Sequence, residues 1–207
     1  FEKYYNLLVL YNEKFNITAI TEKKEVYIKH FIDSALASPF FNVQNFIDVG
    51  SGGGFPAIPI MIMNENIKGT CLEATGKKCE FLNAVIKELG LKNASVINGR
   101  AEELAIKPEY REKFDLCSAR AVARLNTLSE YCMPFVKVGG KFIALKGDAK
   151  EEIIEAENAI KVLGGKLKNL KEFELEGAKR TIIEIEKIEK TDKKYPRGRG
   201  KERKNPL

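Results

Sequence analysis

Residues 46–60, "FIDVGSGGGFPAIPI", place four glycines within five positions, directly after an apolar run that ends in Asp48 and Val49. Glycine has no side chain, so a glycine-rich turn lets the backbone approach a ligand closely. Three ligands are usually held in this way: the pyrophosphate of a dinucleotide, the phosphates of a nucleoside triphosphate, and the sugar and amino-acid parts of S-adenosylmethionine. The glycines Gly50, Gly52 and Gly54 are therefore candidate cofactor-binding residues.

The residues around the glycines favour S-adenosylmethionine. A P-loop requires Lys followed by Ser or Thr, and no such pair follows here. A dinucleotide fingerprint requires glycine or alanine where Phe55 stands. Pro56 and Pro59 fall in the first turn of the next predicted helix, and they lack the N–H groups that bind a pyrophosphate. S-adenosylmethionine carries no phosphate and loses nothing by their absence.

Acidic residues follow the next predicted strands. Glu73 ends the strand "GTCLEA", where a carboxylate can accept both ribose hydroxyls of an adenosyl group, although such an acid is often only a solvated loop residue. Asp48 is expected to orient the loop or to face the methionyl ammonium. Ala101 and Glu102 follow the third strand, where an adenine ring would lie; Glu102 is alternatively an ordinary acid at a helix start.

The elements that position these residues are strands alternating with helices from residue 46 onward. Strands are predicted in "NFIDVG", "GTCLEA", "ASVINGR", "FDLCSARA" and "GGKFIALKG", and a closing antiparallel pair in "KLKNLKEFEL" and "RTIIEIEKI". The expected fold is Rossmann-like α/β, a mostly parallel seven-stranded sheet with a terminal antiparallel hairpin. Residues 1–40 are expected to form a helical cap, with helices over residues 2–15 and after Thr21 as N-cap, followed by the main domain over 41–189 and a basic tail over 190–207.

The charge of the chain is concentrated in its last residues. The formal net charge is +6 over 207 residues, and residues 187–207 alone carry nine basic and three acidic side chains. A basic tail indicates a polyanionic partner or, alternatively, a solvated end. Arg197 and Arg199 in this tail are candidate substrate-positioning residues, and Tyr195 is a candidate for stacking on a base.

Composition excludes several other classes. No apolar run approaches the roughly 18 residues of a membrane span, so no membrane partner is expected. The four cysteines form no C-x-x-C pair and are expected to be buried free thiols in a reducing cytoplasm, and a metal site is not expected. His30 is expected to dock the cap on the domain rather than to act as a catalyst.

Seven segments occur in an order that resembles one family. They are "FNITAI", "HFIDS", "DVGSGGGFPAIPI", "NGRAEE", "SARAVA", "ALKG" and "KYPRGRGKERKNPL". The chain resembles the glucose-inhibited division protein B (GidB) family along essentially its whole length. The resemblance implies a cytoplasmic, monomeric methyltransferase that uses S-adenosylmethionine and acts on N7 of one guanine in bacterial 16S rRNA or the small ribosomal subunit. Carried over by position, it assigns cofactor contacts to Gly50, Phe55, Ala101, Glu102 and Arg120.

This chemistry requires no general base, because guanine N7 is a lone pair without a proton, and proximity with in-line orientation supplies most of the catalysis. Arg100, Arg120, Arg124 and Lys146 stand near strand ends and are expected to hold phosphates or donate to guanine O6; Lys146 alternatively pairs with a nearby acid. Three other functions stay open on the residues alone: a methyltransferase with a small-molecule or protein substrate, a non-catalytic RNA-binding protein, and, more distantly, a nicotinamide enzyme.

Overall fold

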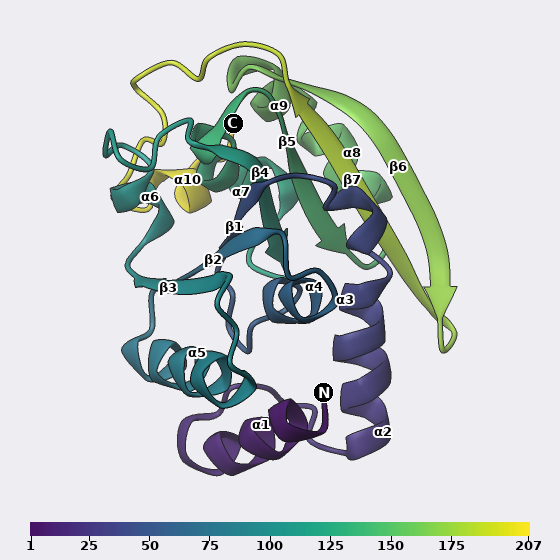
Figure 1. The fold of residues 1–207 in the computed structure, drawn as a ribbon. Helices are drawn as coiled ribbons and strands as arrows, with labels where there is room; N and C mark the ends of the chain where they lie inside the picture. The colour runs from purple at the N-terminus through teal and green to yellow at the C-terminus, as the bar shows by residue number, and fades with distance from the viewer.

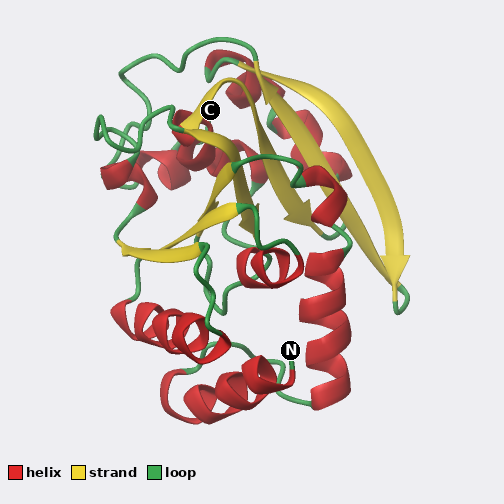
Figure 2. Ribbon diagram, in the orientation of Figure 1, coloured by secondary structure: helices red, strands yellow, loops and turns green.

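A seven-stranded sheet forms the centre of the computed structural model, which describes residues 1–207 (Figures 1 and 2). The strand order is β3-β2-β1-β4-β5-β7-β6. The first five strands pair in parallel, and β7 runs antiparallel to both β5 and β6, as the sequence predicts. The strand bounds are β1 Asn45–Val49, β2 Lys68–Glu73, β3 Ala94–Asn98, β4 Phe114–Arg120, β5 Val136–Lys146, β6 Gly165–Leu175 and β7 Ala178–Lys187.

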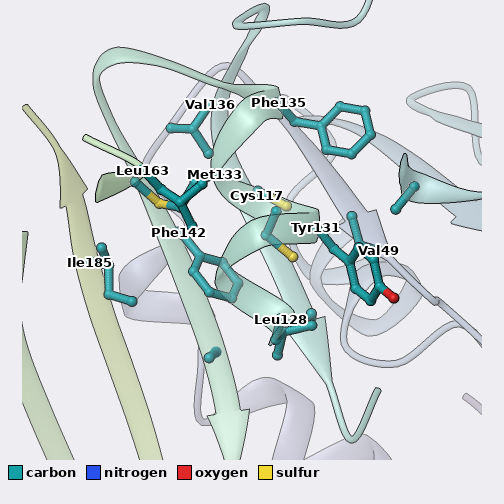
Figure 3. Close-up of a cluster of buried hydrophobic side chains, with 14 of the residues drawn as sticks. Val49, Cys117, Leu128, Tyr131, Met133, Phe135, Val136, Phe142, Leu163 and Ile185 are labelled. Carbon is teal, nitrogen blue, oxygen red and sulfur yellow. The ribbon is translucent and has the colours of Figure 1, made fainter. Parts of the chain in front are cut away.

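Helices cover both faces of the sheet because neighbouring strand residues point to opposite sides. Phe46 packs into one hydrophobic cluster with α1, α4 and α5, whereas Ile47 packs into the other with α7 and α9. Figure 3 shows the second cluster, which contains Leu128 and Tyr131 of α7 and Phe142 of β5. The helices are α1 Glu2–Phe15, α2 Lys23–Val26, α3 Asp33–Ala35, α4 Ala57–Met63, α5 Gly76–Leu89, α6 Ala101–Leu104, α7 Leu125–Cys132, α8 Lys150–Glu155, α9 Glu157–Val162 and α10 Lys201–Lys204. No helix is long and apolar enough to cross a membrane.

The second cap helix begins one residue later than predicted. The Glu22 carboxylate, not Thr21, caps α2 by accepting a hydrogen bond of 2.8 Å from the N–H of Glu25. A π-helical stretch, Tyr27–Ile32, joins α2 to α3 in one continuous helical segment (Figure 1). This segment carries His30 and Asp33 to the carboxyl edge of the sheet, where they enter the site described below.

The C-terminal segment, residues 188–207, folds back over α7 (yellow in Figure 1). Tyr195 is only 8% exposed within the core, so the prediction that it stacks on a nucleic-acid base is wrong. Arg111 donates to the carbonyl oxygens of Thr191, Asp192 and Tyr195, and the Thr127 hydroxyl donates to the carbonyl of Glu202. The segment is thus anchored at its buried residues Thr191, Tyr195, Pro196 and Glu202, whereas most of its other residues are exposed, as the alternative of a solvated end predicts.

Candidate cofactor and substrate site

The carboxyl ends of the first four strands border a cavity of about 470 Å³, here called the glycine-loop cavity. This is the edge where ligands bind in open α/β sheets, beside the point where the strand order reverses between β1 and β4. Several predicted residues share its wall with two residues of the C-terminal segment: Gly50, Gly52, Glu73, Arg100, Ala101, Glu102 and Arg120, with Gly200 and Arg203.

The glycine loop has a backbone that side chains would disrupt. Gly50 has φ +70°, and a Cβ there would lie 2.7 Å from a Val122 methyl group. Gly54 has φ +88°, and a Cβ there would collide with the Tyr4 hydroxyl and Ile58. Gly50 therefore keeps the cavity open, whereas Gly54, which does not line the cavity, lets the loop pack against the cap and α4.

Glu73 holds the loop and also lines the glycine-loop cavity. Its Oε2 accepts a hydrogen bond of 2.9 Å from the N–H of Gly52, and its Oε1 accepts one of 2.8 Å from the N–H of Thr75. A carboxylate has about four acceptor positions, so each oxygen can accept a further hydroxyl from a ligand. The side chain is buried, which keeps this acceptor in one orientation.

Asp48 lies behind the glycine loop and outside the cavity wall. Its Oδ1 accepts 2.7 Å from the Ser118 hydroxyl, and its Oδ2 has no hydrogen-bond partner. Burial raises the pKa of this carboxyl to about 7, because the charged form loses hydration there. Of the two expected roles, orienting the loop fits this position, and facing a methionyl ammonium does not.

Phe55 also lies outside the cavity wall, although the family resemblance assigns it a cofactor contact. Its ring stacks on His30 at 4.5 Å and on Tyr4 at 5.5 Å between ring centroids. The Arg120 guanidinium lies 5.0 Å from the ring centroid, within range of a cation–π contact. Phe55 thus joins the glycine loop to the cap.

His30 occupies the docking position that its sequence context predicts. Its Nε2 lies 2.9 Å from the Thr18 hydroxyl, and Nη2 of Arg120 lies 3.2 Å from its Nδ1. Burial, and then the nearby Arg120 charge, lower the pKa of His30 to about 4. The ring is therefore neutral at physiological pH, which lets it pack between Phe55 and a cation.

A second cavity of about 600 Å³, here called the cap cavity, adjoins the first at residues 120–122. Arg120, Ala121 and Val122 line both cavities. The remaining wall of the cap cavity comes from the cap, the β4–α7 loop, β5, β6, β7 and α8. It includes Lys29, His30, Asp33, Arg124, Lys146, Glu152, Phe173 and Arg180.

Ion pairs fix most cations of the two cavities. Arg120 and Arg180 bind the two oxygens of Asp33 at 2.9 and 3.0 Å. Lys146 donates 2.7 Å to Glu152, which is the acid pairing that was the alternative for this lysine. Arg124 at the rim binds Glu155 through two hydrogen bonds of 2.9 and 2.8 Å. Arg100 is 68% exposed and lies 3.8 Å from Glu102, and Arg199 in the tail is exposed.

The expectation that the basic side chains of the tail are free to bind RNA is wrong for Arg197. Its guanidinium binds both oxygens of Glu130, at 3.0 Å and 2.7 Å for the two shortest contacts, and the Glu130 side chain is only 1% exposed. A buried carboxylate must be paired, and this one is paired by the tail. Arg197 therefore fastens the C-terminal segment to α7 instead of presenting a free positive charge.

Asp33 and Arg180 belong to the site but were not predicted from the sequence, and Arg203 was expected only as a cation of the basic tail and not in a cofactor cavity. Asp33 was visible only as the residue three positions after His30, and Arg180 only as the start of a strand. Arg180 and Asp33 lie 147 positions apart in the chain, and the antiparallel docking of β7 brings them together. Residue spacing along the chain carries no signal for such a pair.

Comparison with known proteins gives one family. The family model for GidB, described as rRNA small subunit methyltransferase G, matches residues 1–183. A protein of Brevibacillus brevis named ribosomal RNA small subunit methyltransferase G is 50% identical, over the whole of this chain and 90% of the relative. Relatives of the same name from Acetivibrio thermocellus and Clostridium perfringens are each 47% identical, over the whole chain and 87% and 89% of their own lengths.

Solved structures share the fold at low identity. A SAM-dependent methyltransferase from Aquifex aeolicus has a TM-score of 0.61 and 15% identity, covering 82% of this chain and 96% of the other. A geranyl diphosphate methyltransferase has a TM-score of 0.63 and 10% identity, covering 76% and 78%. These likenesses confirm the predicted Rossmann-like architecture and concern the fold alone.

Proposed function

The chain belongs to the GidB family, rRNA small subunit methyltransferase G, and from this premise we propose that it transfers a methyl group from S-adenosylmethionine to N7 of a guanine in bacterial 16S rRNA. One observation carries the proposal: two cavities adjoin at the carboxyl edge of the sheet, where both are lined by residues 120–122. Methyl transfer requires a donor and an acceptor held on either side of a short gap, and this arrangement provides one chamber for each.

The glycine-loop cavity fits S-adenosylmethionine by size and by its polar groups. A volume of about 470 Å³ is within the usual range for a cofactor site. Glu73 offers oriented acceptors for the ribose hydroxyls, and the bare backbone at Gly50 and Gly52 admits the amino-acid part. The helix that follows the loop begins at Ala57 with Pro56 as its N-cap, and neither residue lines the cavity. The site thus lacks the helix N-terminus that would hold a pyrophosphate.

When bound, the cofactor supplies an electrophilic methyl group on a positively charged sulfur. The protein's own residues then have to hold guanine so that N7 faces that methyl group. No proton leaves N7, so the reaction requires no general base. The neutral His30 therefore has no part in proton transfer. Arg120 and Arg180 are held by Asp33 at the wall of the cap cavity, where they contribute to binding RNA phosphates or base edges.

Both cavities are completed by residues of a single chain, the cap cavity by residues 29–33 and the glycine-loop cavity by Gly200 and Arg203. We propose accordingly that the enzyme acts as a monomer. Because its substrate is ribosomal RNA, we place its action in the cytoplasm.

The test is a methylation assay on 16S rRNA taken from cells that lack this protein. The rRNA is incubated with the enzyme and methyl-labelled S-adenosylmethionine, digested to nucleosides, and analysed by mass spectrometry. We expect labelled 7-methylguanosine from one site. Label in another nucleoside, or none in rRNA, would contradict the proposal.

A matched pair of glycine variants ties that activity to the loop. Gly50→Ala would force a Cβ against Val122 at a positive φ, so we expect S-adenosylmethionine affinity to fall at least about tenfold. Gly76→Ala has open space around the added methyl group and should leave the affinity unchanged. Equal affinities in the two variants would separate the loop from cofactor binding.

A further inference from the structure

An ion pair in the wall of the cap cavity joins Lys146, a residue expected to hold phosphates or donate to guanine O6, to Glu152, which has no role so far. Lys146 ends β5, and its Nζ lies 2.7 Å from Oε2 of Glu152 in α8. Nζ also donates to the carbonyl oxygen of Ala123, and the same Oε2 accepts 2.8 Å from the N–H of Leu125. The pair is therefore held by the β4–α7 loop, β5 and α8 together, and the Lys146 side chain is only 8% exposed.

Part of the pair's hydrogen-bonding capacity is unused. An ammonium has three N–H donors, and Lys146 uses two of them. Oε1 of Glu152 makes no hydrogen bond, while Oε2 makes two. Both residues line the cap cavity. A positively charged donor and a negatively charged acceptor thus stand side by side in the chamber proposed for the acceptor base.

This donor–acceptor order matches one nucleobase. Guanine presents an O6 acceptor directly beside its N1–H and N2–H donors, whereas adenine presents an N6 donor beside an N1 acceptor. We propose that Lys146 and Glu152 bind the Watson–Crick edge of the target guanine, Lys146 at O6 and Glu152 at N1–H, and thereby set the base specificity of the enzyme. This proposal rests on the proposed function. Adenine in the same position would place donor against donor and acceptor against acceptor, which is strongly unfavourable in a buried site.

The position of Lys146 also orients the reacting atom. Leu145, the residue before it, pairs with Arg120 in the β4–β5 register, so Lys146 lies beside the wall of residues 120–122. On the guanine ring, O6 and N7 are on adjacent sides. A guanine bound at N1–H by Glu152 and at O6 by Lys146 therefore has N7 on the Lys146 side, next to residues 120–122, where the two cavities adjoin. The same two contacts select the base and orient its reacting atom.

The charge of Glu152 is suited to the reaction as well as to binding. In the transfer, the N7 lone pair forms the bond to the methyl carbon, the carbon–sulfur electron pair stays on sulfur, and no proton moves. The guanine ring gains one positive charge, which makes N1–H a stronger donor. A carboxylate at N1–H therefore binds the transition state more tightly than the substrate, and this raises kcat.

The test compares substrates that differ only in the target base. The 16S rRNA substrate carries guanine, inosine or adenine at the site that the wild-type enzyme methylates. We expect wild type to accept guanine and inosine, which share O6 and N1–H, and to reject adenine by at least about 10³-fold in kcat/KM. In Glu152→Gln, kcat on guanine should fall by about 10²-fold, and the guanine-to-adenine ratio should fall at least about tenfold, because a Gln amide can donate to adenine N1.

Glu151→Gln is the matched control, since Glu151 is exposed on the same helix and forms no ion pair. S-adenosylmethionine affinity is measured for each variant to show that the fold is intact. A Glu152→Gln enzyme that loses activity but keeps the wild-type guanine-to-adenine ratio would overturn the proposal, as would a wild type that rejects inosine as strongly as adenine. If instead wild type forms no 7-methylguanosine, the proposed function itself has failed.

Discussion

The two ends of the chain both fold onto the reactive edge of the sheet, but each closes a different cavity. The N-terminal cap places Lys29, His30 and Asp33 in the wall of the cap cavity, and the C-terminal segment places Gly200 and Arg203 in the wall of the glycine-loop cavity. The residues that line both cavities, Arg120, Ala121 and Val122, lie at and just after the end of β4, between these two ends of the chain. The division suggests that the cap serves the RNA and the C-terminal segment serves the cofactor.

The two ends are also fastened differently. Asp33 of the cap binds Arg120 and Arg180, two cations that line the cap cavity. The C-terminal segment is held by Arg197 on Glu130, a pair away from both cavity walls. The cap is thus fastened by an ion pair in a cavity wall, where a ligand can reach its cations, whereas Arg197 is used within the protein away from both cavities.

The largest expected effect comes from releasing the C-terminal segment. Arg197→Ala removes the guanidinium from the buried Glu130 and leaves it only the backbone N–H of residue 197, and losses of a buried ion partner cost about 3–5 kcal/mol. We expect the free energy of unfolding, measured by urea denaturation, to fall by that amount. Arg199→Ala, at an exposed position two residues away, should change it by less than about 0.5 kcal/mol. Equal, small effects in both variants would show that the segment is held by other contacts.

The free energy of unfolding should depend on pH through His30 of the cap. Burial and Arg120 lower its folded pKa to about 4, while an unfolded histidine titrates near 6.5, so the unfolded chain binds the extra proton between these values. The contribution to stability is complete above pH 6.5 and is lost as the pH falls to 4, by about 3 kcal/mol.

The measurement is the difference in unfolding free energy between wild type and His30→Gln across that pH range. A difference is needed because Asp48, whose folded pKa is raised to about 7 by burial, has the opposite sign: its contribution is complete below pH 3.8 and is lost as the pH rises through 7. A wild-type-minus-variant difference that stays constant with pH would contradict the buried, neutral histidine.

A hydrogen bond from the cap to the glycine loop predicts an exception to the rule that the cap serves only the RNA. Tyr4 of the cap is buried, and its hydroxyl donates to the carbonyl oxygen of Gly53 beneath the cofactor loop. Tyr4→Phe removes this bond, which costs about 1–2 kcal/mol. We expect the dissociation constant for S-adenosylmethionine, measured by calorimetry, to rise a few fold. Tyr5→Phe, which loses only a 3.2 Å bond at the exterior, should not change it. If neither variant changes cofactor affinity, the cap has no part in shaping the loop.

The glycine loop and its strand could be predicted from the sequence because their chemistry lies in neighbouring residues. The run of small residues, the prolines and Glu73 at the next strand end are all local signals, and the structure brings Gly50, Gly52 and Glu73 together in one wall. The strands themselves followed in the same way from short apolar segments.

The contacts of the two chain ends could not be predicted, since they join residues that are distant in the sequence. The positive charge of the last residues indicated an outward-facing surface, but the buried Glu130 that binds Arg197 lies 67 positions earlier on α7. The position of Phe55, which contacts the cap and not the cofactor cavity, could not be predicted for the same reason. Its ring is covered by Tyr4 and His30, which the sequence places in a separate unit.

The central claim is that the two cavities separate cofactor from RNA, and a crossed binding measurement tests it most directly. Arg180 lines only the cap cavity and Arg203 only the glycine-loop cavity. Dissociation constants for S-adenosylmethionine and for unmethylated 16S rRNA are measured at one salt concentration for wild type, Arg180→Ala and Arg203→Ala. We expect Arg180→Ala to weaken RNA binding about tenfold with unchanged cofactor affinity, and Arg203→Ala to weaken cofactor binding about three- to tenfold with unchanged RNA affinity. Equal weakening of both ligands by either variant, or the reverse pattern, would contradict the account.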